Sequence, residues 1–67
     1  MIKVKVGQLL KERGKNATDL MRDARIAYTT ALRLSKGEGD GMSFAVLDRL
    51  CAFFNVRVED IIEYVPD

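Results

Sequence analysis

The first residues of the chain alternate between apolar side chains and lysines, which is the period of a short strand with one face in water. We therefore expect a strand over residues 2–6. From Val6 the apolar positions follow a helical period, with Leu9 and Leu10 on one face. Gly14 is the type of residue that ends a helix in the left-handed conformation, so the first helix is expected to stop there.

Two short amphipathic stretches, 17–24 and 26–36, follow and are joined by a very tight turn at Arg25. Asn16 is a good N-cap acceptor for the first stretch, and Asp19 completes a variant of the capping box. Two helices joined so closely cross at a steep angle, which leaves one face of the second helix free. This geometry suits insertion of helix 26–36 into a DNA major groove. The inward positions are expected to be Ala17, Leu20, Met21 and Ala24 in the first helix and Ile26, Thr30, Ala31 and Leu34 in the second.

The second half of the chain contains a glycine-rich loop and two further helical patterns. The loop covers residues 37–41. Ser43 is a candidate N-cap for a fourth helix that Asn55 ends, and a short fifth helix is expected from Val58. The terminal segment and strand 2–6 have no other obvious partner, so we expect them to form a β-pair. The fourth helix is predicted to bury Phe44, Leu47, Leu50, Cys51 and Phe54.

Length and composition narrow the class of protein. The 67 residues are expected to form a single domain, 1–67, and a hydrophobic content of 48% is ample for a small core. No apolar run approaches the ~20 residues that span a bilayer, and no secretion signal is visible. One cysteine and no histidine leave no intrachain disulfide, no zinc site and no Cys–His or Ser–His catalytic pair. We therefore expect a cytoplasmic domain that is not an enzyme, with no catalytic residues, metal, cofactor or small-molecule effector.

Charge is distributed unevenly along the chain, although the net charge is only +1. Residues 11–36 contain seven basic and three acidic side chains, a net charge of +4, whereas the residues from Glu38 onward contain two arginines and seven acids. The positive segment coincides with the helix pair, which favours a side that faces phosphates over ordinary solvated helix faces. Glu38 and Asp40 follow this segment directly, and their carboxylates would repel a nearby DNA backbone.

Four runs of sequence resemble a known family. They are 9–14 (LLKERG), Arg33–Leu34 with Gly37, 47–51 (LDRLC) and 60–67 (DIIEYVPD). Together they look like the small phage-repressor and Cro-like (XRE-type) helix-turn-helix regulators. The resemblance implies an all-α, five-helix lambda-repressor-like domain with a short β-pair between the N- and C-terminal segments. In such a domain the helix-turn-helix core covers about 16–36, and helix 26–36 is the recognition helix.

The resemblance also implies which residues touch double-stranded DNA. Base contacts are expected from Ala27, Tyr28, Thr29, Leu32 and Arg33. Phosphate contacts are expected from Asn16, Thr18 and Lys36 and near the start of the fourth helix, and the cation of Arg25 falls near a phosphate as well.

Several of these positions have alternative interpretations. Arg33 either pairs bidentately with guanine or forms a surface salt bridge within the bundle, and the two are weighted equally. For Thr30 we favour a bond from its hydroxyl to a carbonyl of its own helix. Ala27 and Leu32 cannot hydrogen-bond to a base edge but can touch a thymine methyl group. Arg25 replaces the glycine common in such turns, which is costly where the turn needs a positive φ.

The fourth helix is apolar nearly all round, so Val46 and Phe53 have no evident core to fill. We expect them to form the interface of a two-fold homodimer; alternatively, Phe53 covers the terminal β-pair. Cys51 is expected to be a small buried hydrophobe. The predicted function is a sequence-specific DNA-binding transcriptional regulator without a membrane partner. The alternative is a protein-interaction module on the same fold with weak or lost DNA binding.

Overall fold

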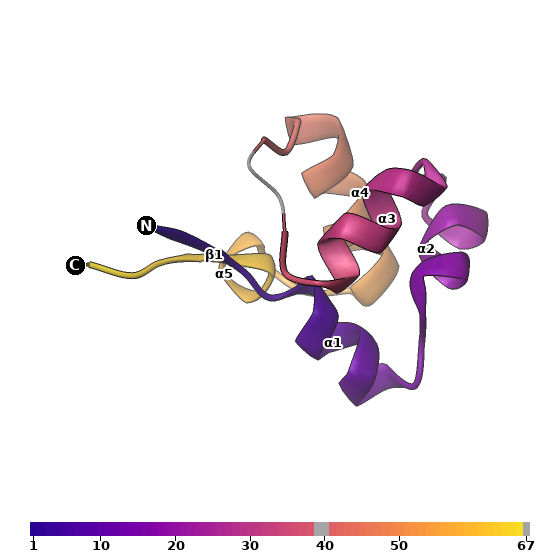
Figure 1. Ribbon diagram of the computed structural model, residues 1–67, viewed down its shortest axis with the longest axis horizontal. Helices are drawn as coiled ribbons and strands as arrows, with labels where there is room; N and C mark the ends of the chain where they lie inside the picture. Colours follow the sequence, from indigo (N-terminus) through magenta and orange to yellow (C-terminus); the bar gives the residue numbers. More distant parts are fainter. Residues whose placement is uncertain (39–40, 67) are drawn as a thin grey trace.

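The computed structural model describes residues 1–38 and 41–66. Gly39 and Asp40 of the predicted loop, and Asp67, lie outside the described residues. Within this part of the chain, five helices surround one core and a two-stranded sheet joins the chain ends (Figure 1). The elements are β1 (Ile2–Val4), α1 (Val6–Arg13), α2 (Ala17–Asp23), α3 (Tyr28–Ser35), α4 (Phe44–Phe54), α5 (Val58–Ile61) and β2 (Ile62–Tyr64).

Local chemistry sets most helix ends, as predicted. The Ser43 side chain accepts a hydrogen bond from the Val46 N–H at the start of α4. Gly14 ends α1 at φ 64°, and Asn55 ends α4 at φ 55°. In both cases the residue in the left-handed conformation lets the N–H of the following residue donate to a carbonyl group of the last helical turn. That carbonyl group would otherwise lack a partner.

The predicted β-pair between the two ends of the chain is present. The strands are antiparallel, with Ile2 opposite Tyr64 and Val4 opposite Ile62. β1 ends at Val4 rather than at residue 6, because Lys5 is already the N-cap of α1 and donates its N–H to the Ile61 carbonyl at 2.8 Å. Figure 1 shows the two termini leaving the body side by side.

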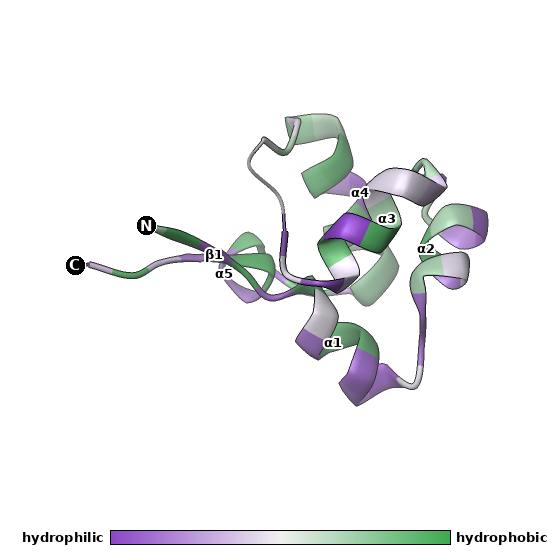
Figure 2. Cartoon of the chain, viewed as in Figure 1, coloured by the Kyte–Doolittle hydropathy of each residue, from purple (hydrophilic) through white to green (hydrophobic). Residues whose placement is uncertain are grey.

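The core is apolar throughout, with no buried polar or charged side chain among the described residues. Every helix contributes to it, and Phe54, Leu20, Leu50 and Ile61 are its largest fully buried side chains. Figure 2 shows that α4 is hydrophobic along most of its length. The complete core consists of Val6, Leu9, Leu10, Ala17, Leu20, Ala24, Ile26, Ala31, Leu34, Leu50, Phe54 and Ile61.

Two predicted core residues lie at the surface instead. Met21 is 41% exposed and Phe44 is 89% exposed. The side of α4 that meets the core is centred on Leu50 and Phe54, and Phe44 lies roughly 100° around the helix from that direction at 3.6 residues per turn. Phe44 also lies in the first turn of α4, which adds to its exposure.

Gly7 sets the approach of α1 to α3. A Cβ atom added at Gly7 would overlap the Ser35 carbonyl oxygen at the end of α3. Because this neighbour is backbone, it cannot rotate away, and a larger residue would push the two helices apart. The absence of a side chain at this one position therefore fixes where α3 sits on the body.

We predict that Gly7→Ala lowers the free energy of unfolding by about 1–3 kcal/mol, because it overpacks the α1–α3 contact. Chemical denaturation followed by circular dichroism measures this change. Gly41→Ala is the matched control, since no atom lies within 4 Å of its added Cβ and its effect is expected within about 0.5 kcal/mol. Equal stability of the Gly7→Ala variant and the parent would contradict the close approach.

Candidate nucleic-acid interface

A reciprocal capping box fixes the start of α2. The Asn16 Oδ1 atom accepts from the Asp19 N–H at 3.1 Å, and the Asp19 carboxylate accepts from the Asn16 N–H at 2.9 Å. The prediction of this motif is confirmed. The bond uses the Asn16 oxygen, so its side-chain N–H groups are the part of this residue that is left to meet a ligand.

The turn between α2 and α3 is held by burial on both sides of Arg25. Ala24 and Ile26 are 6% and 2% exposed, while Arg25 is exposed and adopts φ 57°. The Ile26 N–H reaches back to the Leu20 carbonyl at 3.4 Å. The turn therefore has the positive φ that is costly for a residue with a side chain. The Arg25 side chain is directed away from the core. Arg49 of α4 donates to the Arg25 carbonyl at 3.4 Å, a contact that no sequence pattern indicated.

α3 is fixed by Ala31 and Leu34, which are 0% and 3% exposed. Its end is a Schellman motif in which Gly37, at φ 79°, donates to Leu34 and the next N–H bonds the Arg33 carbonyl at 2.9 Å. The helix is shorter than the predicted 26–36, because Ile26 belongs to the turn and Lys36 is the C-cap.

The predicted base-contacting residues gather on the outward side of α3. Ala27, Tyr28, Thr29 and Arg33 are exposed, and Leu32 is half-buried. At 100° per residue, the α3 members of this set and Lys36 fall within roughly 140° of the helix circumference, away from the buried residues. This side is called the outward arc of α3, and all of its members except the half-buried Leu32 are exposed.

Thr30 differs from its prediction. It is half-buried, and the hydrogen bonds of the described residues include none from its hydroxyl. Ser35 makes that kind of bond instead, from its Oγ to the Leu32 carbonyl at 2.7 Å.

The basic side chains of this region fall into two groups. Arg22 is paired with Asp19 at 2.8 Å and with Asp23 at 3.2 Å, and Arg13 donates to the Phe54 carbonyl at 2.9 Å. Arg25, Arg33 and Lys36 are exposed, and among the residues of the two described stretches none of them forms an ion pair. Lys11 on α1 and Lys15 before α2 are exposed and outside these ion pairs as well. Arg25, Arg33 and Lys36 are the unpaired cations of the turn and of α3, where they are available to phosphates or bases, and Thr18 is exposed on α2.

The Arg22 pair perturbs the ionisation of both partners. The hydrogen bond from Arg22 is the main cause that lowers the pKa of the Asp23 carboxyl, and it likewise raises the pKa of Arg22. Both groups are in contact with water, so the effect on stability is small. Its importance is electrostatic, because two carboxylates neutralise the Arg22 charge locally.

The residues predicted to form a dimer interface are partly used within the chain. Val46 and Phe53 are half-buried and pack against the core. The Phe53 ring lies 4.9 Å from that of Phe54, at an interplanar angle of 82°. Phe53 borders a depression of about 290 Å³ beside Ala24 and Arg25. It therefore lies next to the α2–α3 turn.

Residues 1–38 and 41–66 bring together no group of three metal-binding side chains. None of the helices in this part of the chain is both long and apolar enough to cross a membrane.

Two short helices at a tight turn, with the second exposed along one side, define a helix-turn-helix protein. The chain belongs to the Cro/C1-type HTH DNA-binding domain family, whose profile matches residues 5–67. This is a family of non-enzymatic DNA-binding domains, in agreement with the sequence-based expectation.

Structural comparison agrees with the family. The chain is similar to the crystal structure of the transcriptional regulator VanUg, with a TM-score of 0.73 and 29% identity over 98% of this chain and 89% of that one. No curated protein matches the chain significantly. The resemblance inferred from the sequence and the five-helix fold are thereby confirmed.

We predict that Arg22→Ala raises the pKa of Asp23 back toward its ordinary value of 3.8, because the main hydrogen-bond donor is removed. NMR titration of the Asp23 carboxyl carbon measures this pKa. In the parent, a lowered folded-state pKa means that the pair stabilises the fold above the ordinary carboxyl pKa, and that this contribution disappears as the pH falls through the lowered value. An unchanged Asp23 titration in the variant would contradict the assignment.

Proposed function

We propose that this protein is a sequence-specific DNA-binding transcriptional regulator that acts in the cytoplasm, with α3 as the recognition helix in the major groove. The observation that carries this proposal is the outward arc of α3, which presents Arg33 and Lys36 without ion-pair partners among the described residues, in a chain of a DNA-binding family. The similar protein VanUg is described as a transcriptional regulator. No chemical step is involved, because occupancy of the site would itself regulate transcription.

Base reading would depend on a few side chains of α3. Arg33 can pair bidentately with guanine, and the hydroxyls of Tyr28 and Thr29 supply single hydrogen bonds. Ala27 and Leu32 offer only apolar contact, which suits a thymine methyl group. The proposed readout is therefore centred on Arg33, with weak discrimination elsewhere.

Phosphates would be held at both ends of the helix pair. Lys36 lies at the C-terminal end of α3 and Arg25 at the turn, while Asn16 and Thr18 lie at the start of α2. Arg22 is excluded from this set because Asp19 and Asp23 neutralise it.

Weak discrimination by one subunit favours a homodimer that reads two half-sites. Half-sites one helical turn apart are separated by roughly 34 Å, and one subunit measures 35 × 20 × 19 Å. Two copies side by side can therefore place one α3 in each successive turn of the groove. The half-buried Val46 and Phe53 remain candidates for the contact between copies.

A protein-interaction module is the second proposed function, and the apolar share of the outward surface favours it. Tyr28 is 46% exposed on α3 and Met21 is 41% exposed on α2. Exposed aromatic and methionine side chains are typical of protein interfaces.

Titration with random-sequence duplex DNA at several salt concentrations separates the two functions. Two phosphate-binding cations in each copy, Arg25 and Lys36, give four in a dimer, so we predict a log–log slope of roughly −3.6. Fluorescence anisotropy measures the slope. Absence of binding at ~50 mM salt would overturn the DNA-binding proposal and favour the interaction module.

Single substitutions test the division of roles within the same assay. Arg33→Ala is expected to reduce discrimination at one base position by about 1–3 kcal/mol. Lys36→Ala should weaken all sequences alike and reduce the salt slope by about 1.8, because one cation is lost from each copy of the dimer. Arg22→Ala is the matched control, since its charge is already neutralised and little change is expected. If Arg22→Ala weakens binding as much as Lys36→Ala does, the assignment of free and paired cations is wrong.

A further inference from the structure

The depression of about 290 Å³ beside the α2–α3 turn, here called the turn depression, combines apolar and cationic side chains. Ala24 of α2 and Ala52 and Phe53 of α4 supply the apolar part, and Arg25 and Arg49 supply the cations. Phe53 is half-buried, so its ring belongs partly to the core and partly to this surface. Among the described residues, none from α3 lines the turn depression, which is therefore separate from the outward arc of α3.

The two arginines of the turn depression have no carboxylate partner among the described residues. Arg49 donates one hydrogen bond, from Nη1 to the Arg25 carbonyl at 3.4 Å, which holds its guanidinium group next to the turn. A guanidinium group has five N–H donors, so others remain for a ligand. Asp23 also lines the depression, but Arg22 donates to both of its carboxylate oxygens, at 3.2 and 3.4 Å. An approaching group therefore meets a positive local charge.

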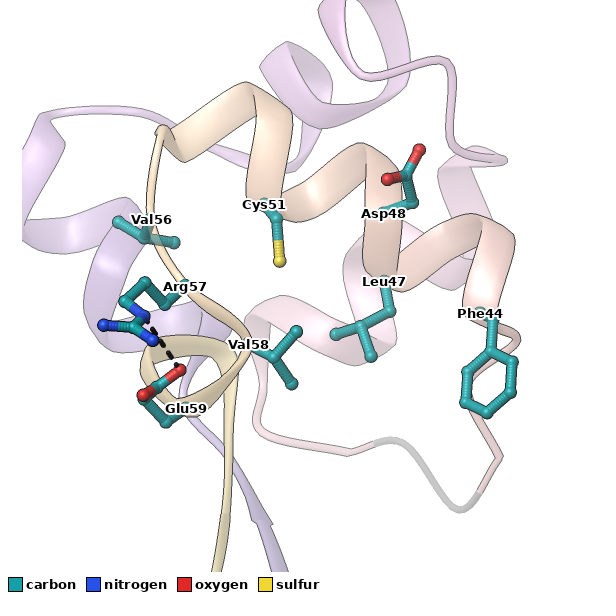
Figure 3. Close-up of a pocket in the computed structure, with 8 residues that line it drawn as sticks. All are labelled: Phe44, Leu47, Asp48, Cys51, Val56, Arg57, Val58 and Glu59. Atoms are coloured by element: carbon teal, nitrogen blue, oxygen red, sulfur yellow. Dashed lines mark ion pairs between the residues drawn. The ribbon is translucent and has the colours of Figure 1, made fainter.

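The depression between α4 and the start of α5 has a different charge balance (Figure 3). Its one arginine, Arg57, is paired with Glu59 at 3.6 Å, and Asp48 adds a second carboxylate. Of these two depressions, the turn depression is the one that presents unpaired cations beside apolar side chains, so it favours an anionic ligand.

The side chains of the turn depression define the chemistry of that ligand. Guanidinium groups match carboxylates in bidentate geometry, and an apolar side chain gains free energy by covering Ala52 and Phe53. A DNA backbone offers phosphates but no apolar side chain, so it would leave the apolar part of this surface unused. An extended protein segment offers both groups on one face, because side chains two residues apart point to the same side of a strand.

We propose that the turn depression docks a segment of another protein in which an apolar side chain lies between two carboxylates. The apolar side chain covers Phe53, and the carboxylates pair with Arg25 and Arg49. The proposed function assigns Arg25 to a DNA phosphate, and on that assignment the docked segment and DNA compete for one cation. A partner that binds here therefore weakens DNA binding without covering the outward arc of α3.

NMR titration of the isotope-labelled chain with the peptide acetyl-Glu-Ala-Phe-Ala-Glu-amide tests the docking surface. Shifts are expected at the amides of Arg25, Arg49, Ala52 and Phe53. A neutral peptide with glutamine at both glutamate positions should bind about fivefold more weakly, and so should an acidic peptide with alanine in place of phenylalanine. No shifts at millimolar peptide, or equal binding of the neutral peptide, would overturn the proposal.

Substitutions of Arg49 test the charge of the site. Arg49→Gln is expected to weaken binding of the acidic peptide about fivefold, and Arg49→Lys should recover part of the loss because it keeps the charge. Arg57→Gln is the matched control, since the Arg57 side chain is 83% exposed and lines the other depression. Circular dichroism checks that the variants remain folded. Equal effects of Arg49→Gln and Arg57→Gln would show that the turn depression is not the site.

A second copy of the chain is the competing occupant, because Phe53 is also a candidate for the contact between copies. Sedimentation equilibrium of Arg49→Gln distinguishes the two. An unchanged dimer dissociation constant together with weaker peptide binding supports the docking of another protein. A raised dimer dissociation constant with unchanged peptide binding assigns the turn depression to the second copy and overturns the proposal.

Competition with random-sequence duplex DNA separates this inference from the proposed function. The acidic peptide is expected to lower the affinity of the parent for DNA more than the alanine-substituted peptide of equal charge does. A parent that binds the peptide at the turn depression but binds no DNA leaves the docking surface standing and overturns the regulator. A parent that binds DNA but not the peptide does the reverse. If DNA shifts the Ala52 and Phe53 amides and the peptide does not, the depression belongs to the DNA interface and the proposal is wrong.

Discussion

The orientation of α3 depends on the burial of Ala24 and Ile26 around a left-handed residue. The positive φ of Arg25 costs about 1–2 kcal/mol for a residue with a side chain. Full burial of an isoleucine contributes about 1.5–3 kcal/mol, and Ile26 is only 2% exposed. The hydrophobic gain at Ile26 thus offsets the backbone cost at Arg25. The tight turn is maintained by the core, and its long cationic side chain remains at the surface.

The same core decides which cations are available. Ala31 and Leu34 fix the inner side of α3, so Arg33 and Lys36 must face outward. On α2, Asp19 precedes Arg22 by three residues, the spacing that brings side chains together on a helix, and Asp23 is the next residue in the sequence. Both carboxylates pair with Arg22, so its charge is neutralised locally. Formal charge along the sequence does not distinguish paired from unpaired cations, and the structure does.

Prediction from sequence succeeded where local chemistry is decisive. The helix ends are set by conformational preferences or side-chain hydrogen bonds of single residues, namely Gly14, Asn16, Ser43 and Asn55. Such effects can be predicted from a few neighbouring residues in the sequence. Prediction failed at Phe44, because the apolar pattern of α4 is broad and does not show that its buried side is centred on Leu50 and Phe54. The contact of Gly7 with Ser35 and the bond from Arg49 to Arg25 join distant segments, so no local pattern encodes them.

The uneven charge along the chain corresponds to two different surfaces of the molecule. The proposed DNA surface carries Arg25, Arg33 and Lys36, whereas the depression between α4 and the start of α5 is lined by two acids, Asp48 and Glu59, and one base, Arg57. A polyanion approaching such a molecule is attracted to one surface and repelled from the other, so the charges orient the encounter before any base is read. The excess of acid beside this apolar depression therefore disfavours contact with nucleic acid there, in keeping with a DNA surface on the side of α3.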